Sequence, residues 1–246
     1  MNKDSYDRAY RQLVRGHLAA MRVTVQETDL SVYARIKDPD AVKESVVQQR
    51  GYIEGYLQRH PEFGRALRPW PDDPLAPPIV RSMIRAAKRA GVGPMAAVAG
   101  AVSEAVGRSL LGRSEEVIVE NGGDIFLSVQ QRITIGIFAG QSPLSLKVGL
   151  KITPDQTPMA VCTSSGTIGH SLSYGKADAV CVLSDSCALA DAAATSIGNR
   201  VGHHRDISPA IMAGRKIDGV TGILIIIGDK MGMWGAMELT RLRSDG

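Results

Sequence analysis

Aromatic residues are scarce in this chain. Phe, Trp and Tyr make up 4% of its 246 residues, whereas glycine occurs 26 times. This composition excludes a core of stacked rings and favours one of Ala, Val, Ile, Leu and Met, with close backbone approaches at glycine. The length allows one large domain or two small ones, and a sizeable core in either case.

Cysteine is also scarce. The three residues Cys162, Cys181 and Cys187 form no CxxC pair and no Cys/His cluster with zinc spacing. A metal ribbon and a disulfide framework are therefore not indicated. We expect three buried, reduced thiols.

Long hydrophobic runs and targeting signals are missing as well. The most apolar run, GILIIIG at 222–228, is far too short to span a bilayer, and the charged N-terminus has no apolar stretch typical of export. We therefore expect a cytoplasmic protein without a membrane segment. The net charge of +4 would help an anionic ligand approach but falls short of a nucleic-acid footprint.

Periodicity in the first half predicts a hairpin and three helices. Residues 21–35 alternate between apolar and polar on both sides of a turn at 27–29. A helix follows, with Asp38 or Asp40 as its N-cap and Pro61 as its stop, and further helices are predicted over 78–91 and 91–112. Six of the twelve prolines fall at 61–78, which favours an extended, semi-rigid connector that wraps the surface or covers a pocket.

The second half reads as strands and turns with one more helix. Strands are predicted within 115–129, 132–140, 144–152, 159–166 and 222–242, and residues 178–199 read as a strand followed by a helix. Strands paired in hairpins with helices between them indicate an α+β fold with mostly antiparallel sheets and packed helices.

Small residues form a stripe on the helix predicted over 91–112. Ala96, Gly100, Ser103 and Gly107 are spaced by four, three and four, so they lie on one face. A face without bulk permits either tight packing on another backbone or the close approach of a flat ligand. The sequence leaves both open.

Two glycine-bearing turns could bind a ligand. In ENGGD at 120–124, Gly122 and Gly123 permit positive φ and Asp124 adds a polar end. A plain hairpin turn accounts for the same residues. In TSSG, Thr163, Ser164, Ser165 and Gly166 supply hydroxyls and backbone N–H donors such as a phosphate would use.

Asp191 and Thr195 are four residues apart in a run of small residues, so a helix places both on one face. A carboxylate and a hydroxyl are the hard oxygen ligands that Mg²⁺ prefers, and Mg²⁺ usually completes its shell with water and substrate phosphates. The alternative is a plain N-terminal charge on the helix. We expect this pair and the two glycine-bearing turns to converge around one cavity.

Other polar residues are weaker candidates. His170 follows the hydroxyl loop and could act as a general base, or it could be a structural histidine. Glu104 is a third candidate oxygen donor. His203 and His204 lie in a basic loop, where surface exposure or anion contact is favoured over metal binding.

The order and spacing of these motifs resemble the ApbE-type FAD:protein FMN transferases. Those enzymes carry a GGD turn, a TSG loop and a D-x-x-x-T helix, which correspond to Gly122 to Asp124, Thr163 to Gly166, and Asp191 with Thr195. The likeness covers about residues 92–230. The whole chain, with ETDL, PEF and VGPMAAVAGA, resembles a small prokaryotic family of the ApbE-like superfamily.

The resemblance implies a single ApbE-like domain over residues 1–246, with a fold related to the tunnelling fold. It also implies FAD as cofactor, Mg²⁺ on its pyrophosphate, and transfer of FMN to Thr or Ser of a target protein with release of AMP. Asp191 and Thr195 would bind the metal, and residues 163–166 and 122–124 would lie at the flavin or its phosphates.

This chain departs from the transferase pattern in two places. The Lys-Gly pair that precedes GGD in those enzymes reads Ala99-Gly100 here, and the segment after the hydroxyl loop is short and retains only His170. Two hypotheses follow: a metal-dependent flavin or nucleotide-handling protein that performs FMN transfer or pyrophosphate cleavage, and a non-catalytic module that binds a flavin or another anionic, phosphate-bearing metabolite. The sequence leaves homo-oligomer formation open.

Overall fold

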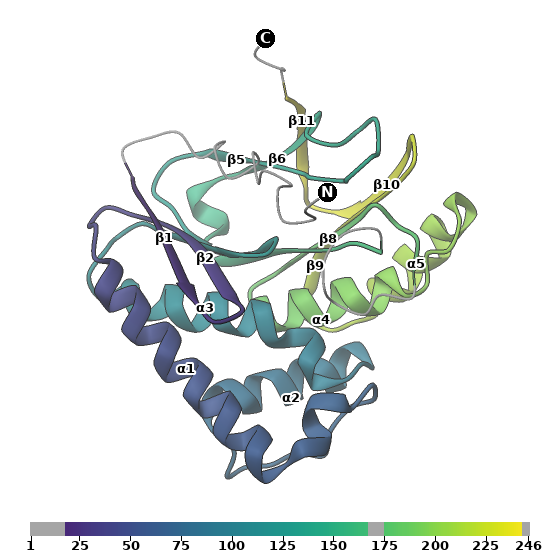
Figure 1. Cartoon of the computed structure of the whole chain (residues 1–246). Helices are drawn as coiled ribbons and strands as arrows, with labels where there is room; N and C mark the ends of the chain where they lie inside the picture. The colour runs from purple at the N-terminus through teal and green to yellow at the C-terminus, as the bar shows by residue number, and fades with distance from the viewer. Residues whose placement is uncertain (1–17, 167–174, 243–246) are drawn as a thin grey trace, which may run out of the picture.

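An eight-stranded antiparallel sheet forms the centre of the protein. Figure 1 shows the computed structural model, which describes residues 18–166 and 175–242. Its strand order is β1-β2-β3-β4-β7-β8-β9-β10. The strands are β1 (Ala19–Val25), β2 (Thr28–Ala34), β3 (Val117–Asn121), β4 (Asp124–Ser128), β7 (Met159–Ser164), β8 (Ala179–Ser184), β9 (Val220–Ile227) and β10 (Lys230–Gly235). The predicted α+β class with antiparallel sheets is confirmed.

Helices cover one face of this sheet and a three-stranded sheet covers the other (Figure 1). The helices are α1 (Pro39–Arg59), α2 (Pro78–Ala90), α3 (Val98–Leu110), α4 (Cys187–Gly198) and α5 (Ile207–Gly214). The small sheet has the order β11-β6-β5 and contains β5 (Ile133–Gly136), β6 (Val148–Ile152) and β11 (Glu238–Arg241). Two apolar clusters lie under the helices and a third lies between the sheets.

The N-terminal hairpin and α1 form as predicted, with a shifted turn. The turn lies at Gln26 and Glu27, and Asp29 belongs to β2, where its carboxylate pairs with Arg22 at 2.9 Å. The turn at 27–29 was therefore wrong by about two residues, because Gln26 itself adopts the positive φ of 52° that reverses the chain. Asp38 is the N-cap of α1, and its side chain accepts the N–H of Ala41.

The proline-rich connector is less extended than its composition predicts. Residues Pro61–Arg65 form a short 3₁₀ helix, η2, and Phe63 is fully buried. The ring of Phe63 lies 5.0 Å from that of Tyr56 and 5.5 Å from that of Trp70. The extended prediction was wrong for this part because a cluster of the chain's few aromatic rings anchors it against α1.

Two C-terminal elements and one pairing were missed. The strands β5 and β6 form a separate sheet with β11 instead of continuing the main meander, and neither β11 nor α5 was predicted. The pairing of β11 with β6 joins residues as far apart in sequence as Lys151 and Glu238. Local periodicity carries no information on such distant partners.

The three cysteines are free and buried, as predicted. Among the described residues, no single helix is long and apolar enough to cross a membrane. The helices Pro78–Ala90 and Pro94–Leu110 meet that test only together, as a pair bent by 105°.

The small-residue stripe of α3 packs against backbone and ring atoms. A Cβ on Gly100 would lie 2.3 Å from the carbonyl oxygen of Cys187 in α4, and one on Gly107 would lie 2.1 Å from the ring of Phe126 in β4. Of the two alternatives for this stripe, the structure has tight packing. The stripe sets how closely α3 approaches α4 and the sheet.

Substitution of Gly100 by Ala should therefore destabilise the fold. The added methyl group would force α3 and α4 apart, and we expect a loss of about 1–3 kcal/mol in the free energy of unfolding. Urea denaturation with an unchanged m-value measures this loss.

Gly51→Ala in α1 is the matched control, because a Cβ at Gly51 meets nothing within 4 Å. It should stabilise the protein by about 0.5–1 kcal/mol through helix propensity. Equal effects of the two substitutions would contradict close packing at Gly100.

Candidate functional site

The helix α4 presents a single polar line to solvent. Ser186 caps its N-terminus, and ten of its twelve residues are buried. Asp191 and Thr195 are the two that are not. Because Asp191 and Thr195 are one turn apart, they lie on the same face of the helix. We call this solvent-accessible pair the polar strip.

Asp191 is held by the backbone at the start of α3. Its Oδ2 accepts the N–H of Gly100 at 2.9 Å, and the N–H of Ala99 also donates to the carboxylate. The missing side chain at Gly100 permits this contact, since a Cβ there would lie 2.9 Å from the Cβ of Asp191. The carboxylate is therefore fixed in position by two main-chain donors.

The Gly122–Gly123 turn lies beside the same end of α3. Both glycines have positive φ, 66° and 108°, and join β3 to β4. The amide of Asn121 donates to the carbonyl of Ala99 at 3.2 Å, and the hydroxyl of Ser103 donates to the carbonyl of Asp124 at 2.9 Å. These two bonds place the turn next to the residues that hold Asp191.

The carboxyl of Asp124 faces that of Asp191. It is buried beneath the helix layer, and both its removal from water and its repulsion by Asp191 raise its pKa well above the ordinary value. Burial raises the pKa of Asp191 to about 7, against the donated bonds from Gly100 and Ala99 that lower it. Within the described part of the chain, no Lys, Arg or His forms an ion pair with either carboxyl.

The hydroxyl loop runs from the glycine turn towards the far end of α4. The N–H of Thr163 donates to the carbonyl of Gly123 at 3.2 Å. At the other end, a Cβ on Gly166 would lie 2.0 Å from the carbonyl oxygen of Gly175, and one on Gly175 would lie 1.9 Å from that of Gly198. The loop thus links the glycine turn to the C-terminus of α4.

The hydroxyls of this loop do not all face the polar strip. Side chains alternate along a strand, so Ser164 lies on the helix-covered face of the sheet with Cys162, whereas Thr163 lies on the other face, where its side chain hydrogen-bonds Cys181. Ser164 is therefore better placed than Thr163 to reach a ligand at the strip. The binding roles of residues 163–166 and 122–124 stay predictions.

The remaining candidates from the sequence are His170, Glu104, and the neighbours His203 and His204. His170 lies outside the described residues. Glu104 contacts the start of α4 instead of Asp191: its Oε2 accepts the N–H of Cys187 at 2.9 Å and its Oε1 pairs with Arg108 at 2.8 Å. His203 and His204 are exposed, as expected, with ring centroids 4.0 Å apart.

No group of three or more His, Cys, Asp or Glu side chains with metal-binding geometry occurs in the described ranges. A cation at the polar strip would thus have few protein ligands. Sequence reasoning missed the main-chain donors of Ala99 and Gly100. It named Asn121 as a polar end of the ENGGD turn but not its bond to α3. Backbone donors leave no signal in a sequence.

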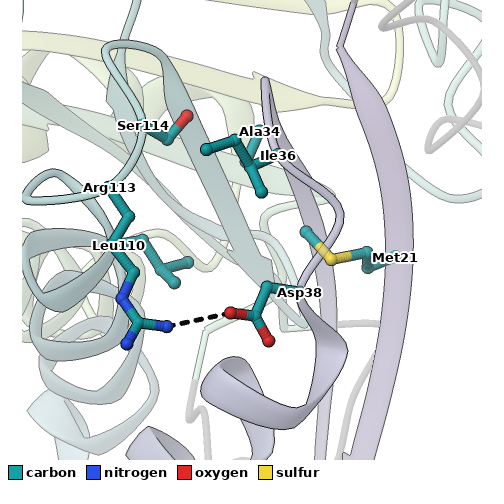
Figure 2. Close-up of a pocket in the computed structure, with 7 residues that line it drawn as sticks. All are labelled: Met21, Ala34, Ile36, Asp38, Leu110, Arg113 and Ser114. Carbon is teal, nitrogen blue, oxygen red and sulfur yellow. Dashed lines mark hydrogen bonds and ion pairs between the residues drawn. The ribbon is translucent and has the colours of Figure 1, made fainter.

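A hollow of about 400 Å³ lies at the opposite, C-terminal end of α3. Figure 2 shows the residues that line it. Arg113 and Asp38 form an ion pair at 2.9 Å beside it. The lining residues are Met21, Ala34, Ile36, Asp38, Leu110, Arg113 and Ser114. None of the predicted site residues lines this hollow, so it is not the cavity around which the motifs were expected to converge.

Comparison with known proteins gives consistent matches. A family model described as AbpE bacteria matches residues 11–228. The UPF0280 protein of Methanosarcina acetivorans is 40% identical over 223 residues, covering 88% of this chain and 87% of that one. The UPF0280 protein of Methanocella arvoryzae is 40% identical over 214 residues, covering 87% of each.

Solved structures share the fold at low identity. Flavin transferase ApbE from Vibrio cholerae matches with a TM-score of 0.57 and 14% identity, covering 89% of this chain and 97% of that one. The ApbE protein of Thermotoga maritima matches with a TM-score of 0.54 and 11% identity, covering 87% and 96%.

The raised pKa of Asp191 predicts a pH-dependent effect of Asp191→Asn. Between its ordinary pKa of 3.8 and about 7, the folded state holds a proton that the unfolded state has lost, so this carboxyl makes stability fall as pH rises through that window. Asn retains an oxygen for Gly100 but cannot ionise. We expect the variant to melt several degrees higher than the wild type at pH 8 and to differ little at pH 4.

Asp218→Asn is the matched control, because the side chain of Asp218 is 90% exposed. Thermal melts of the three proteins from pH 4 to pH 8 measure the difference. A gap between Asp191→Asn and wild type that stays constant over this range would contradict a raised pKa at Asp191.

Proposed function

The chain belongs to the UPF0280 family, described by its model as AbpE bacteria, and from this premise we propose that it handles a flavin nucleotide with a divalent cation at Asp191 and Thr195. The fold supports this proposal, because it is shared with the flavin transferase ApbE from Vibrio cholerae. The proposed reaction is cleavage of the FAD pyrophosphate, with AMP as one product and FMN passed to a protein hydroxyl or to water.

The observation that carries the proposal is a pair of neighbouring carboxyls, that of Asp124 buried and that of Asp191 half-buried, without a described cationic partner. Asp124 and Asp191 repel each other. Buried charges in proteins are normally paired or bound to a metal. The transferases carry a lysine next to the glycine that corresponds to Gly100, and here that position is Ala99. A bound cation would provide the positive charge that the side chains of this region lack.

The donor set fits Mg²⁺. Asp191 offers a carboxylate that two backbone N–H groups hold without exhausting its lone pairs, and Thr195 offers a hydroxyl that donates to no described residue. Two hard protein oxygens suit an ion that keeps several waters and takes further oxygens from a phosphate. When bound, such an ion would neutralise charge on the pyrophosphate as AMP leaves.

The chain's own residues would position the ligand. Gly122 is exposed and has open space around it, so a phosphate or a ring can approach its backbone closely. Ser164 lies on the same face of the sheet as Asp124 and offers a hydroxyl donor. His170 remains the predicted general base.

A second candidate function is a non-catalytic module that binds a flavin or another phosphate-bearing metabolite. The specific observation in its favour is again Ala99: a site with one charge fewer than the transferases loses transition-state stabilisation before it loses ligand contacts. The two candidates share the polar strip and differ in turnover.

Incubation of the purified chain with FAD and Mg²⁺ should release AMP, which chromatography detects. Asp191→Ala should lower the rate at least about 100-fold, and Thr195→Val should weaken the Mg²⁺ dependence about 10-fold, since each removes a proposed ligand oxygen. Asp218→Ala and Thr221→Val, at exposed positions, are the matched controls.

Each result has a distinct meaning. FAD binding that needs Mg²⁺ and Asp191 but yields no AMP identifies the binding module. If calorimetry detects binding of neither Mg²⁺ nor FAD, the metal-dependent flavin function and the flavin-binding module are both refuted. AMP release that survives in Asp191→Ala would place the chemistry elsewhere in the chain.

A further inference from the structure

The strand β10 forms one edge of the eight-stranded sheet. It pairs with β9 on one side, from Lys230 opposite Ile227 to Gly235 opposite Gly222. On its other side no strand pairs with it among residues 18–166 and 175–242, and Figure 1 shows it at the rim of the sheet. An edge of this kind offers backbone donors and acceptors to another strand.

The hairpin geometry identifies the outward backbone groups. A two-residue turn, Gly228 and Asp229, joins β9 to β10, so the closing pair Ile227 and Lys230 exchanges hydrogen bonds. Bonding residues alternate along an antiparallel ladder. The N–H and C=O groups of Met231 and Met233 therefore point away from β9.

This edge lacks the usual protection against pairing. Edge strands commonly carry charges, proline or a bulge, whereas β10 reads KMGMWG and has one charge at its first residue. Met231 and Met233 are 42% and 43% exposed, and Met212 on the neighbouring α5 is 50% exposed. These are the three exposed methionines of the described residues, and methionine suits adaptable protein contacts.

We propose that this edge is the interface of a homodimer, in which β10 of a second copy pairs antiparallel with β10 across a two-fold axis at Gly232. In this register Met231 lies opposite Met233 of the second copy on the face of the small sheet, and the outward backbone groups of both residues bond. Gly232 meets its own counterpart at the axis, with Ile207 of α5 over it on the helix-covered face, where a Cβ on Gly232 would lie 2.3 Å from the Cγ2 of Ile207. The two sheets become one continuous sheet.

The helix-covered face is complementary in the same register. Lys230 lies opposite Trp234 of the second copy, and its ammonium pairs with Asp229 of its own chain at 2.9 Å. Arg215 already lies 5.3 Å from the centroid of the Trp234 ring and forms no ion pair within the described ranges. The carboxylate of Asp229 is 70% exposed, and the two-fold axis brings it to the end of the strand where Arg215 of the second copy lies.

Sedimentation of the full chain tests the dimer. The wild type at tens of micromolar should sediment with twice the monomer mass of 26.3 kDa. Met233→Pro should weaken dimerisation at least about 10-fold, because it removes an outward N–H while the ladder with β9 stays complete. Met233→Leu, which keeps the N–H and the apolar surface, should remain dimeric.

Disulfide trapping tests the register and does not depend on the proline variant folding. The double variant Met231→Cys with Met233→Cys should cross-link under mild oxidation. In the proposed register, position 231 of one copy lies opposite position 233 of the other, within the distance that a disulfide spans. Either single variant should cross-link at least about 10-fold more slowly, because identical residues are offset by two positions. The native cysteines are buried and serve as an internal background.

A wild type that stays monomeric at these concentrations would overturn the proposal. So would a dimer that Met233→Pro, shown to be folded by circular dichroism, leaves unchanged. Faster trapping through a single cysteine than through the pair would refute the axis at Gly232.

Discussion

The contact between α3 and α4 at Gly100 is the constraint on which the rest of the site depends. The two backbones approach so closely that a single methyl group at Gly100 would overlap the carbonyl of Cys187. The same approach brings the N–H of Gly100 to Asp191. Glu104, one turn further along α3, bonds the first N–H of α4 and fixes the helices a second time. Positions along α4 are therefore set relative to α3 by main-chain contacts.

That constraint has an electrostatic consequence. With α4 fixed on α3, Asp191 lies over the start of β4 and its carboxyl faces that of Asp124. Loss of water raises the pKa of both carboxyls, the charge of Asp191 raises that of Asp124 further, and neither has an ion-pair partner among the described residues. The family resemblance and this local shortage of positive charge support the same proposal, a divalent cation at the polar strip.

The central sheet separates this site from the rest of the molecule. Its helix-covered face carries the polar strip and the glycine turn, whereas its other face packs on β5, β6 and β11 and takes Thr163 away from the strip. The edge strand β10 lies at the opposite side of the sheet from β1. A dimer through β10 would leave the polar strip to each copy separately.

Local patterns in the sequence predicted those features that depend on near neighbours: a cap at Asp38 or Asp40, the α+β class, and the shared face of Asp191 and Thr195. The order of three motifs led to the family. The tertiary structure alone decided that β6 pairs with β11, that Glu104 bonds α4, and that the acids at 124 and 191 face each other. Periodicity indicates which side of an element is apolar, whereas contacts between elements arise from packing over long sequence separations. Backbone donors such as the N–H of Gly100 are present in every residue except proline, so the residue type does not reveal which of them bind a side chain.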